Sequence, residues 1–161
     1  MKKMLIVLLV LLLGSTSSIA GELAKLGLDD AKALGLKIEN DSSNKVEGKS
    51  SLKISTLWPT TVCLGEVTGP EIENAKLIYT ADVKSQLEGS ALLELWALVD
   101  GRQYFSRGLN STVSGSSDWM TIQTLFMFQK GQKPERVTLN LIINGKGTVW
   151  IDNIVLSREP L

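Results

Sequence analysis

Apolar residues recur at every second position through most of this chain. The segment 76–85 is an example, and its apolar odd positions are Leu77, Tyr79, Ala81 and Val83. A period of two is typical of a β-strand with one face toward a core and the other toward solvent. After Gly35 no stretch shows the period of 3.6 residues expected of an amphipathic helix. The alternation therefore predicts an all-β fold.

Turn-forming residues divide the alternating pattern into short strands. Nine candidate strands follow one another, at residues 35–39, 51–55, 61–67, 76–85, 90–99, 102–110, 119–128, 135–143 and 148–157. Strands of this length and spacing are typical of antiparallel sandwiches. We predict an antiparallel β-sandwich of the jelly-roll type, with about nine strands in two sheets. Since no repeat or shift in composition divides the chain further, one domain should cover residues 36–161.

The first 20 residues have the pattern of a secretory signal peptide. Two lysines precede an apolar run over residues 4–13, and a small-residue cleavage site ends at Ala20. Ten residues rise only about 15 Å as a helix, about half the thickness of a bilayer's hydrocarbon core. We therefore expect a secreted or periplasmic protein without a stable membrane anchor. Residues 21–35 should form a short helical or irregular segment, with a helix over 30–34.

The residue types that the chain lacks exclude several kinds of catalytic and binding site. The chain has no histidine, which removes the commonest general base and the commonest transition-metal ligand. Its one cysteine, Cys63, cannot form a disulfide within the chain, and its apolar neighbours predict a buried structural thiol. Loss of the signal peptide would leave two fewer basic than acidic residues, with no basic run. We therefore expect no nucleic-acid partner.

The dipeptide Asp100-Gly101 predicts a two-residue hairpin turn between two candidate strands. A turn of this length sets the register, so counting outward places Glu94 opposite Arg107 and Trp96 opposite Phe105. All four side chains should face away from the core, because the apolar residues between them define the inner face. The hairpin thus predicts an aromatic pair beside an acid and a base on an outer sheet face.

Two interpretations of this group stay open. It is either the floor of a ligand site, with rings that stack on a sugar, or two cross-strand pairs contributing about 0.2–1 kcal/mol each to the sheet. The outward polar residues Gln103 and Asn140 would leave room for a groove. Trp58 stands in a loop before Pro59, which favours an extended conformation, and is a second candidate for stacking.

The joint before the last candidate strand contains two glycines. A three-residue loop over 145–147 would pair Ile143 with Val149 and Asn140 with Asp152, provided that the two strands are sheet neighbours. Trp150 in the last strand either stacks on a sugar or covers an edge of the sandwich, and edge cover is favoured.

Three stretches carry a resemblance: VEGKSSLKI at 46–54, Asp118-Trp119, and GTVWIDNIVL at 147–156. They resemble the β-jelly-roll carbohydrate-binding modules of the galactose-binding-like superfamily, over roughly residues 37–157. In that family a Gly-x-x-Ser-Leu strand opens the sandwich and an apolar strand with an acidic pair closes it. The pair is Asp152-Asn153 here. The resemblance implies a carbohydrate ligand.

The same resemblance implies a structural calcium ion near the opening loop and the closing strand. It transfers that site to Glu39, Glu47 and Asp152, whose oxygen donors suit calcium. The alternative for Asp152 is a carboxylate that accepts hydrogen bonds from backbone N–H groups or from Asn140 and so holds a strand end. No cofactor is required on either interpretation.

The function expected from these features is an exported, non-catalytic module that binds carbohydrate or a similar polar ligand. The residues expected to contact the ligand are Trp58, Glu94, Trp96, Gln103, Phe105, Arg107 and Asn140. The alternative is a protein-interaction domain that uses outward Leu125, Met127 and Ile142. A glycoside hydrolase is disfavoured and no catalytic residue is assigned, because Arg107 should lower the pKa of Glu94 when an acid catalyst needs it raised.

Overall fold

The computed structural model describes residues 21–25 and 37–161. The predicted signal peptide and the predicted helix over 30–34 lie outside the described residues. The part of the chain that is described forms seven strands and no helix. The strands are β1 Gly21–Lys25, β2 Lys37–Asp41, β3 Ser51–Thr56, β4 Thr60–Thr68, β5 Ala75–Val99, β6 Arg102–Phe128 and β7 Arg136–Pro160. The all-β antiparallel prediction is confirmed.

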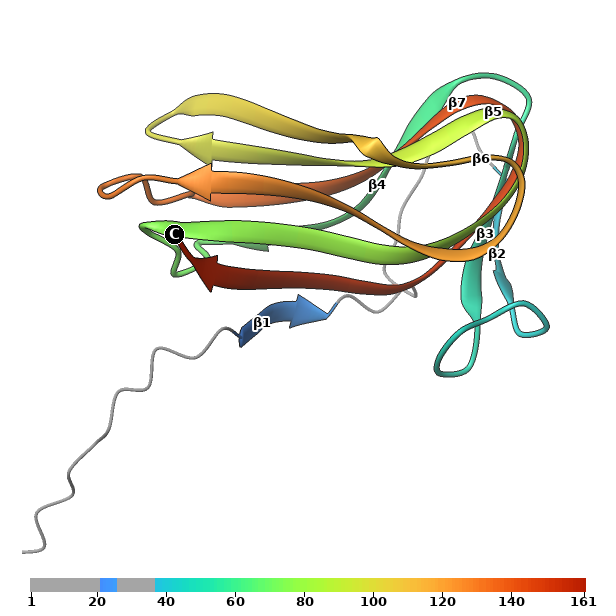
Figure 1. Ribbon diagram of the computed structural model, residues 1–161, viewed down its shortest axis with the longest axis horizontal. Coiled ribbons are helices and arrows are strands. Elements are labelled where there is room, and N and C mark those ends of the chain that lie inside the picture. Colours follow the sequence, from blue (N-terminus) through green and yellow to red (C-terminus); the bar gives the residue numbers. More distant parts are fainter. Residues whose placement is uncertain (1–20, 26–36) are drawn as a thin grey trace, which may run out of the picture.

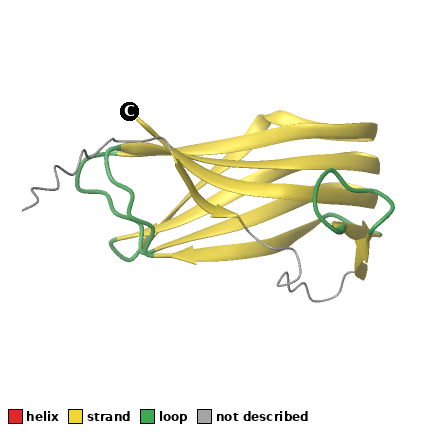
Figure 2. Ribbon diagram, turned by 90° about the horizontal axis from the view of Figure 1, so that it is seen from below, coloured by secondary structure: helices red, strands yellow, loops and turns green. Residues whose placement is uncertain are grey.

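Three strands are far longer than predicted, because β5, β6 and β7 each join two of the candidate strands. Figure 1 shows them turning together at the right of the view and doubling back, so that each contributes to both layers of a sandwich. We call the layer built from β4, residues 90–99, 102–113 and 136–144 layer one. Layer two contains β1, β2, β3 and the other halves of the long strands. Figure 2 shows the two layers from another side.

Glycines allow the long strands to bend. Gly89 on β5 lies opposite Gly145 on β7, and both have positive φ, 142° and 146°. A Cβ at Gly89 would lie 1.9 Å from the Asn144 carbonyl oxygen, and one at Gly145 would lie 2.1 Å from that of Glu88. Only glycine fits backbones this close. The predicted loop over 145–147 is therefore wrong, since β7 continues through it beside β5.

That correction overturns both predicted pairings. Ile143 does not lie opposite Val149, because each lies opposite a residue of β5. Asn140 does not lie opposite Asp152, because the two halves of β7 belong to different layers. Asn140 instead lies opposite Glu94 of β5, and Asp152 lies opposite Asp82. The register predicted from Asp100-Gly101 is confirmed.

The core lies between the layers and consists of the alternating residues that the sequence predicts. Tyr79, Leu95 and Leu141 are fully buried, as are Val149 and Ile151 of the closing strand. Met120 departs from the alternation, because it is 51% exposed at a point where the pairing of β6 with β5 is irregular. The predicted burial of Cys63 is wrong. Cys63 is exposed because the apolar run around it alternates too, so that Val62 and Leu64 face inward while Cys63 faces outward.

The N-terminal segment begins as a strand rather than as a helix or an irregular stretch. β1 pairs antiparallel with β7, with Gly21 opposite Arg158. None of the residues that the structure describes forms a helix long and apolar enough to cross a membrane.

Candidate functional site

Three neighbouring strands of layer one bring the predicted acid and base together on the outer face. Glu94 of β5 lies opposite Arg107 of β6 on one side and opposite Asn140 of β7 on the other. Trp96, two residues along the same face of β5, lies opposite Phe105. The hairpin register assembles four of the seven predicted ligand residues, and the pairing of β5 with β7 adds a fifth, Asn140.

Glu94 is the centre of this group, and its side chain is only 3% exposed. Its Oε1 accepts hydrogen bonds from Trp96 Nε1 at 2.6 Å and from Asn140 Nδ2 at 3.1 Å. Its Oε2 accepts from Arg107 Nε, also at 2.6 Å. A buried carboxylate is tolerated when it is paired and hydrogen-bonded in this way. Both oxygens are therefore engaged within the protein.

The protonation of Glu94 follows from two opposed effects. Desolvation by burial raises its pKa, but the hydrogen bonds from Arg107, Trp96 and Asn140 together outweigh burial, so the pKa lies below its ordinary value. Glu94 is accordingly an ionised anchor. A carboxyl group of this kind is unsuited to act as the acid of a glycoside hydrolase.

The aromatic pair forms a platform beside this anchor. The ring centroids of Trp96 and Phe105 lie 5.1 Å apart, with an interplanar angle of 35°. The guanidinium carbon of Arg107 lies 5.2 Å from the Phe105 centroid, within cation–π range. Phe105 is 53% exposed, and Gln103 is exposed two residues nearer the hairpin turn. The bond from Trp96 to Glu94 holds the indole ring in one orientation, so the platform is preorganised.

Trp58 is not part of this platform. It is 59% exposed in the turn between β3 and β4, and Thr56 Oγ1 accepts a hydrogen bond from its backbone N–H. β4 begins directly after this turn, at Thr60, beside the bend of the long strands. The platform lies at the other end of layer one, because Trp96 lies opposite Thr138, which pairs with Glu66 near the end of β4. The structure therefore separates the two predicted stacking sites.

Two of the three carboxylates of the predicted calcium site, those of Asp152 and Glu39, are engaged within the protein, and the third residue, Glu47, donates its backbone N–H to Asp152. Asp152 Oδ2 accepts from the backbone N–H groups of Val46 and Glu47 at 2.8 and 3.0 Å, and its Oδ1 accepts from Asn153 N–H at 2.8 Å. Glu39 lies within 3.3 Å of two lysine ammonium groups. Among the described residues no set of three acidic, cysteine or histidine side chains could hold a metal ion. Calcium binding stays a prediction.

The structure adds a carboxylate that the sequence analysis missed. Asp41 Oδ2 accepts from Trp150 Nε1 at 2.8 Å and from Asn44 Nδ2 at 3.0 Å, while its Oδ1 accepts from Ser43 N–H at 2.8 Å. These bonds hold the pKa of Asp41 well below its usual range, and the bond from Trp150 has the largest effect. The Asp-Ser-Ser-Asn sequence could have indicated the turn. Its bond to Trp150, 109 positions away, could not be read from the sequence.

Solved structures with a similar fold were found, although no protein-family model and no curated protein matches the sequence. One is the CBM22-1 xylan-binding domain from Paenibacillus barcinonensis Xyn10C, with a TM-score of 0.57, 13% identity, and coverage of 90% of this chain and 99% of that one. This chain therefore has the same β-sandwich fold as this carbohydrate-binding module. At this identity the likeness is one of fold.

Two longer proteins contain the same module fold. The Clostridium thermocellum xylanase 10B CBM22-1-GH10 structure, complexed with xylohexaose, has a TM-score of 0.63 and 10% identity over 86% of this chain. The enzymatically active domain of bacteriophage CBA120 tailspike protein 4 has a TM-score of 0.57 and 10% identity over 77% of this chain. This chain spans 28% and 18% of their respective lengths.

Proposed function

We propose that this chain is an exported, non-catalytic module that binds carbohydrate on the outer face of layer one. The observation that carries the proposal is the preorganised pair of Trp96 and Phe105, whose rings lie 5.1 Å apart on that face. The apolar C–H face of a sugar ring suits such a platform, and the fold shared with carbohydrate-binding modules supports it. Export rests on the signal-peptide pattern of residues 1–20.

Each residue has a distinct role in this proposal. Phe105 and Trp96 stack on the sugar, while exposed Gln103 and half-exposed Arg107 donate to its hydroxyl groups. Glu94 and Asn140 are positioning residues, because both are buried and already hydrogen-bonded to one another. Trp58 would serve a longer ligand that extends along the layer toward the bend.

A glycan array followed by titration of tryptophan fluorescence tests the proposal. Phe105→Ala should weaken binding of an array hit about tenfold, which corresponds to about 1.4 kcal/mol, and Phe105→Trp should restore it. Leu109→Ala is the matched control, since Leu109 is also an exposed apolar residue of β6, at 69%. Equal binding by Phe105→Ala and Leu109→Ala would exclude the platform.

A second candidate function has an observation of its own. Among the described strands β6 pairs with β5 alone, and it exposes Leu125 at 37% and Met127 at 52%. Exposed apolar residues that lie close together favour protein association. Ile142, which the sequence analysis grouped with these two, is only 9% exposed and does not contribute. A dimer in sedimentation velocity that Met127→Lys dissociates, together with an empty glycan array, would favour this function.

A further inference from the structure

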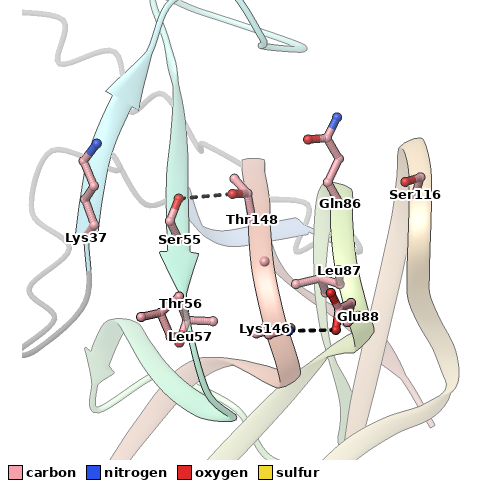
Figure 3. A pocket seen from close by; sticks show the side chains of 11 residues that line it. Lys37, Ser55, Thr56, Leu57, Gln86, Leu87, Glu88, Ser116, Lys146 and Thr148 are labelled. Atoms are coloured by element: carbon pink, nitrogen blue, oxygen red, sulfur yellow. Dashed lines mark hydrogen bonds and ion pairs between the residues drawn. The ribbon is translucent and has the colours of Figure 1, made fainter.

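A hollow lies on the outer side of layer two, next to the bend and on the opposite face of the sandwich from the platform. Its volume is about 790 Å³, within the range of small-molecule sites. Five of its lining residues are direct cross-strand partners on five strands, in the order Ser116, Gln86, Thr148, Ser55 and Lys37. Figure 3 shows these side chains following one another from ribbon to ribbon. They form the floor row of the hollow.

Longer side chains stand on both sides of the floor row. Outward neighbours on a strand are two residues apart, so Lys84, Trp150 and Lys53 follow the row on one side. On the other side Lys146 and Glu88 form an ion pair at 3.0 Å, and Leu57, 76% exposed, also lines the hollow. The polar floor row, with short hydroxyl side chains at Ser116, Thr148 and Ser55, lies between these two rows and makes a groove that runs across the strands.

The dimensions and chemistry of the floor row limit what can lie in it. Five strands at a spacing of about 4.8 Å give a row about 19 Å long, which suits an extended chain rather than a compact molecule. Ser55 Oγ and Thr148 Oγ1 lie 3.1 Å apart and share one hydrogen bond, so each hydroxyl retains capacity for another partner. Gln86 adds an exposed amide that both donates and accepts. Such a floor complements a series of hydroxyl groups.

Each charged side chain around the groove has an ion-pair partner within the protein. Lys37 and Lys53 both pair with Glu39, at 3.3 and 3.2 Å. Lys84 pairs with Asp118 at 3.5 Å, and Lys146 pairs with Glu88. A charged ligand would therefore have to compete with an existing ion pair at each end of the groove. These existing pairs favour a ligand without charge.

The geometry points to a second binding site, in which a neutral linear oligosaccharide lies across the strands of layer two. This site goes beyond the proposed function, because it shares no residue with the Trp96 and Phe105 platform and lies on the opposite layer. Its floor has no aromatic ring, so recognition rests on hydrogen bonds that exchange with those of water. We expect a weak site, with a dissociation constant on the order of 1 mM.

Amide NMR of the purified protein, titrated with xylohexaose and separately with cellohexaose, tests the second site. One of these neutral hexasaccharides should shift the amide signals of Ser55, Gln86, Ser116 and Thr148. Gln86→Arg, which fills the middle of the groove, should weaken that response at least about tenfold. Thr80→Arg is the matched control, because Thr80 lies on the same face of β5, six residues away, outside the groove lining.

Three further arms make the outcome decisive. Phe105→Ala should leave the shifts in the groove unchanged, so failure of the platform and failure of the groove are separable. Ser116→Arg at the end of the row replaces Gln86→Arg if that variant does not fold. The second site is overturned if neither hexasaccharide shifts these four amides, if both groove variants respond like Thr80→Arg, or if only a neutral Ser/Gly peptide shifts them.

Discussion

Two tryptophans on opposite outer faces make the same local contact with different results. Trp96 in layer one donates its indole N–H to Glu94 at 2.6 Å, and Trp150 in layer two donates its own to Asp41 at 2.8 Å. Both carboxylates have a lowered pKa, and the indole hydrogen bond contributes to the lowering in each. The contact alone therefore does not distinguish a binding platform from a structural tie.

The surroundings of the two rings make the distinction. Trp150 is 6% exposed, the Lys53 ammonium lies 5.9 Å from its ring centroid, and its partner Asp41 holds the turn that follows β2. Trp96 is half-buried beside the exposed ring of Phe105, and its partner lies two residues away on the same strand. Trp150 connects two distant segments and is buried between them. Trp96 is hydrogen-bonded within its own strand, so part of its ring stays accessible to a ligand.

Removing each ring gives the largest expected effect. Trp150→Ala should lower the free energy of unfolding by about 4 kcal/mol, because it empties a buried site and releases Asp41. Trp96→Ala should cost about 2 kcal/mol, since only part of that ring is buried. Urea unfolding measures both. Equal losses would show that the two tryptophans are equivalent and would remove the basis for calling one a platform.

Replacing Glu94 tests whether the anchor is as buried as its surroundings indicate. Glu94→Ala should cost about 3 kcal/mol, because it leaves the donors of Trp96 and Asn140 without an acceptor in a buried position. Glu94→Gln keeps one acceptor oxygen and should cost less. A loss below about 1 kcal/mol for Glu94→Ala, as for an exposed ion pair, would contradict the assignment.

Acid should reveal the same anchor through linkage. The folded-state pKa of Glu94 lies below its ordinary value of 4.5. Its contribution to stability is therefore fully present above about pH 4.5 and is lost as the pH falls through the folded-state pKa. The stability difference between the protein and its Glu94→Gln variant should accordingly shrink on acidification from pH 6 to pH 3. A difference that grows over this range would mean that the pKa is raised rather than lowered.

Calcium gives the smallest expected effect. Millimolar calcium chloride should leave the melting temperature unchanged, because the oxygens of Asp152 already accept three backbone N–H bonds. Magnesium chloride at the same concentration is the control for ionic strength. A rise in melting temperature with calcium alone would support the ion that the family resemblance implies, and would require the turn after β2 to rearrange.

Much of the candidate site could be predicted because it depends on short-range rules. Asp100-Gly101 sets the register of the β5–β6 hairpin, and that register alone places Glu94 beside Arg107 and Trp96 beside Phe105. Asn140 was expected on the outer face, but its hydrogen bond to Glu94 could not be predicted, since Asn140 lies on β7, 46 positions from Glu94. A turn signal was mistaken at 145–147, because glycine suits a sharp bend of two paired strands as well as a loop.

The sequence by itself determined that this chain is all-β, which residues face the core, and how its central hairpin pairs. Alternation and two-residue turns are properties of neighbouring positions, so they can be read without knowing the rest of the molecule. Only the tertiary structure decided that three strands pass through both layers, that Trp150 meets Asp41, and that polar side chains from five strands line one groove. Those features depend on which distant strands pair, and pairing is decided by the packing of the whole sandwich.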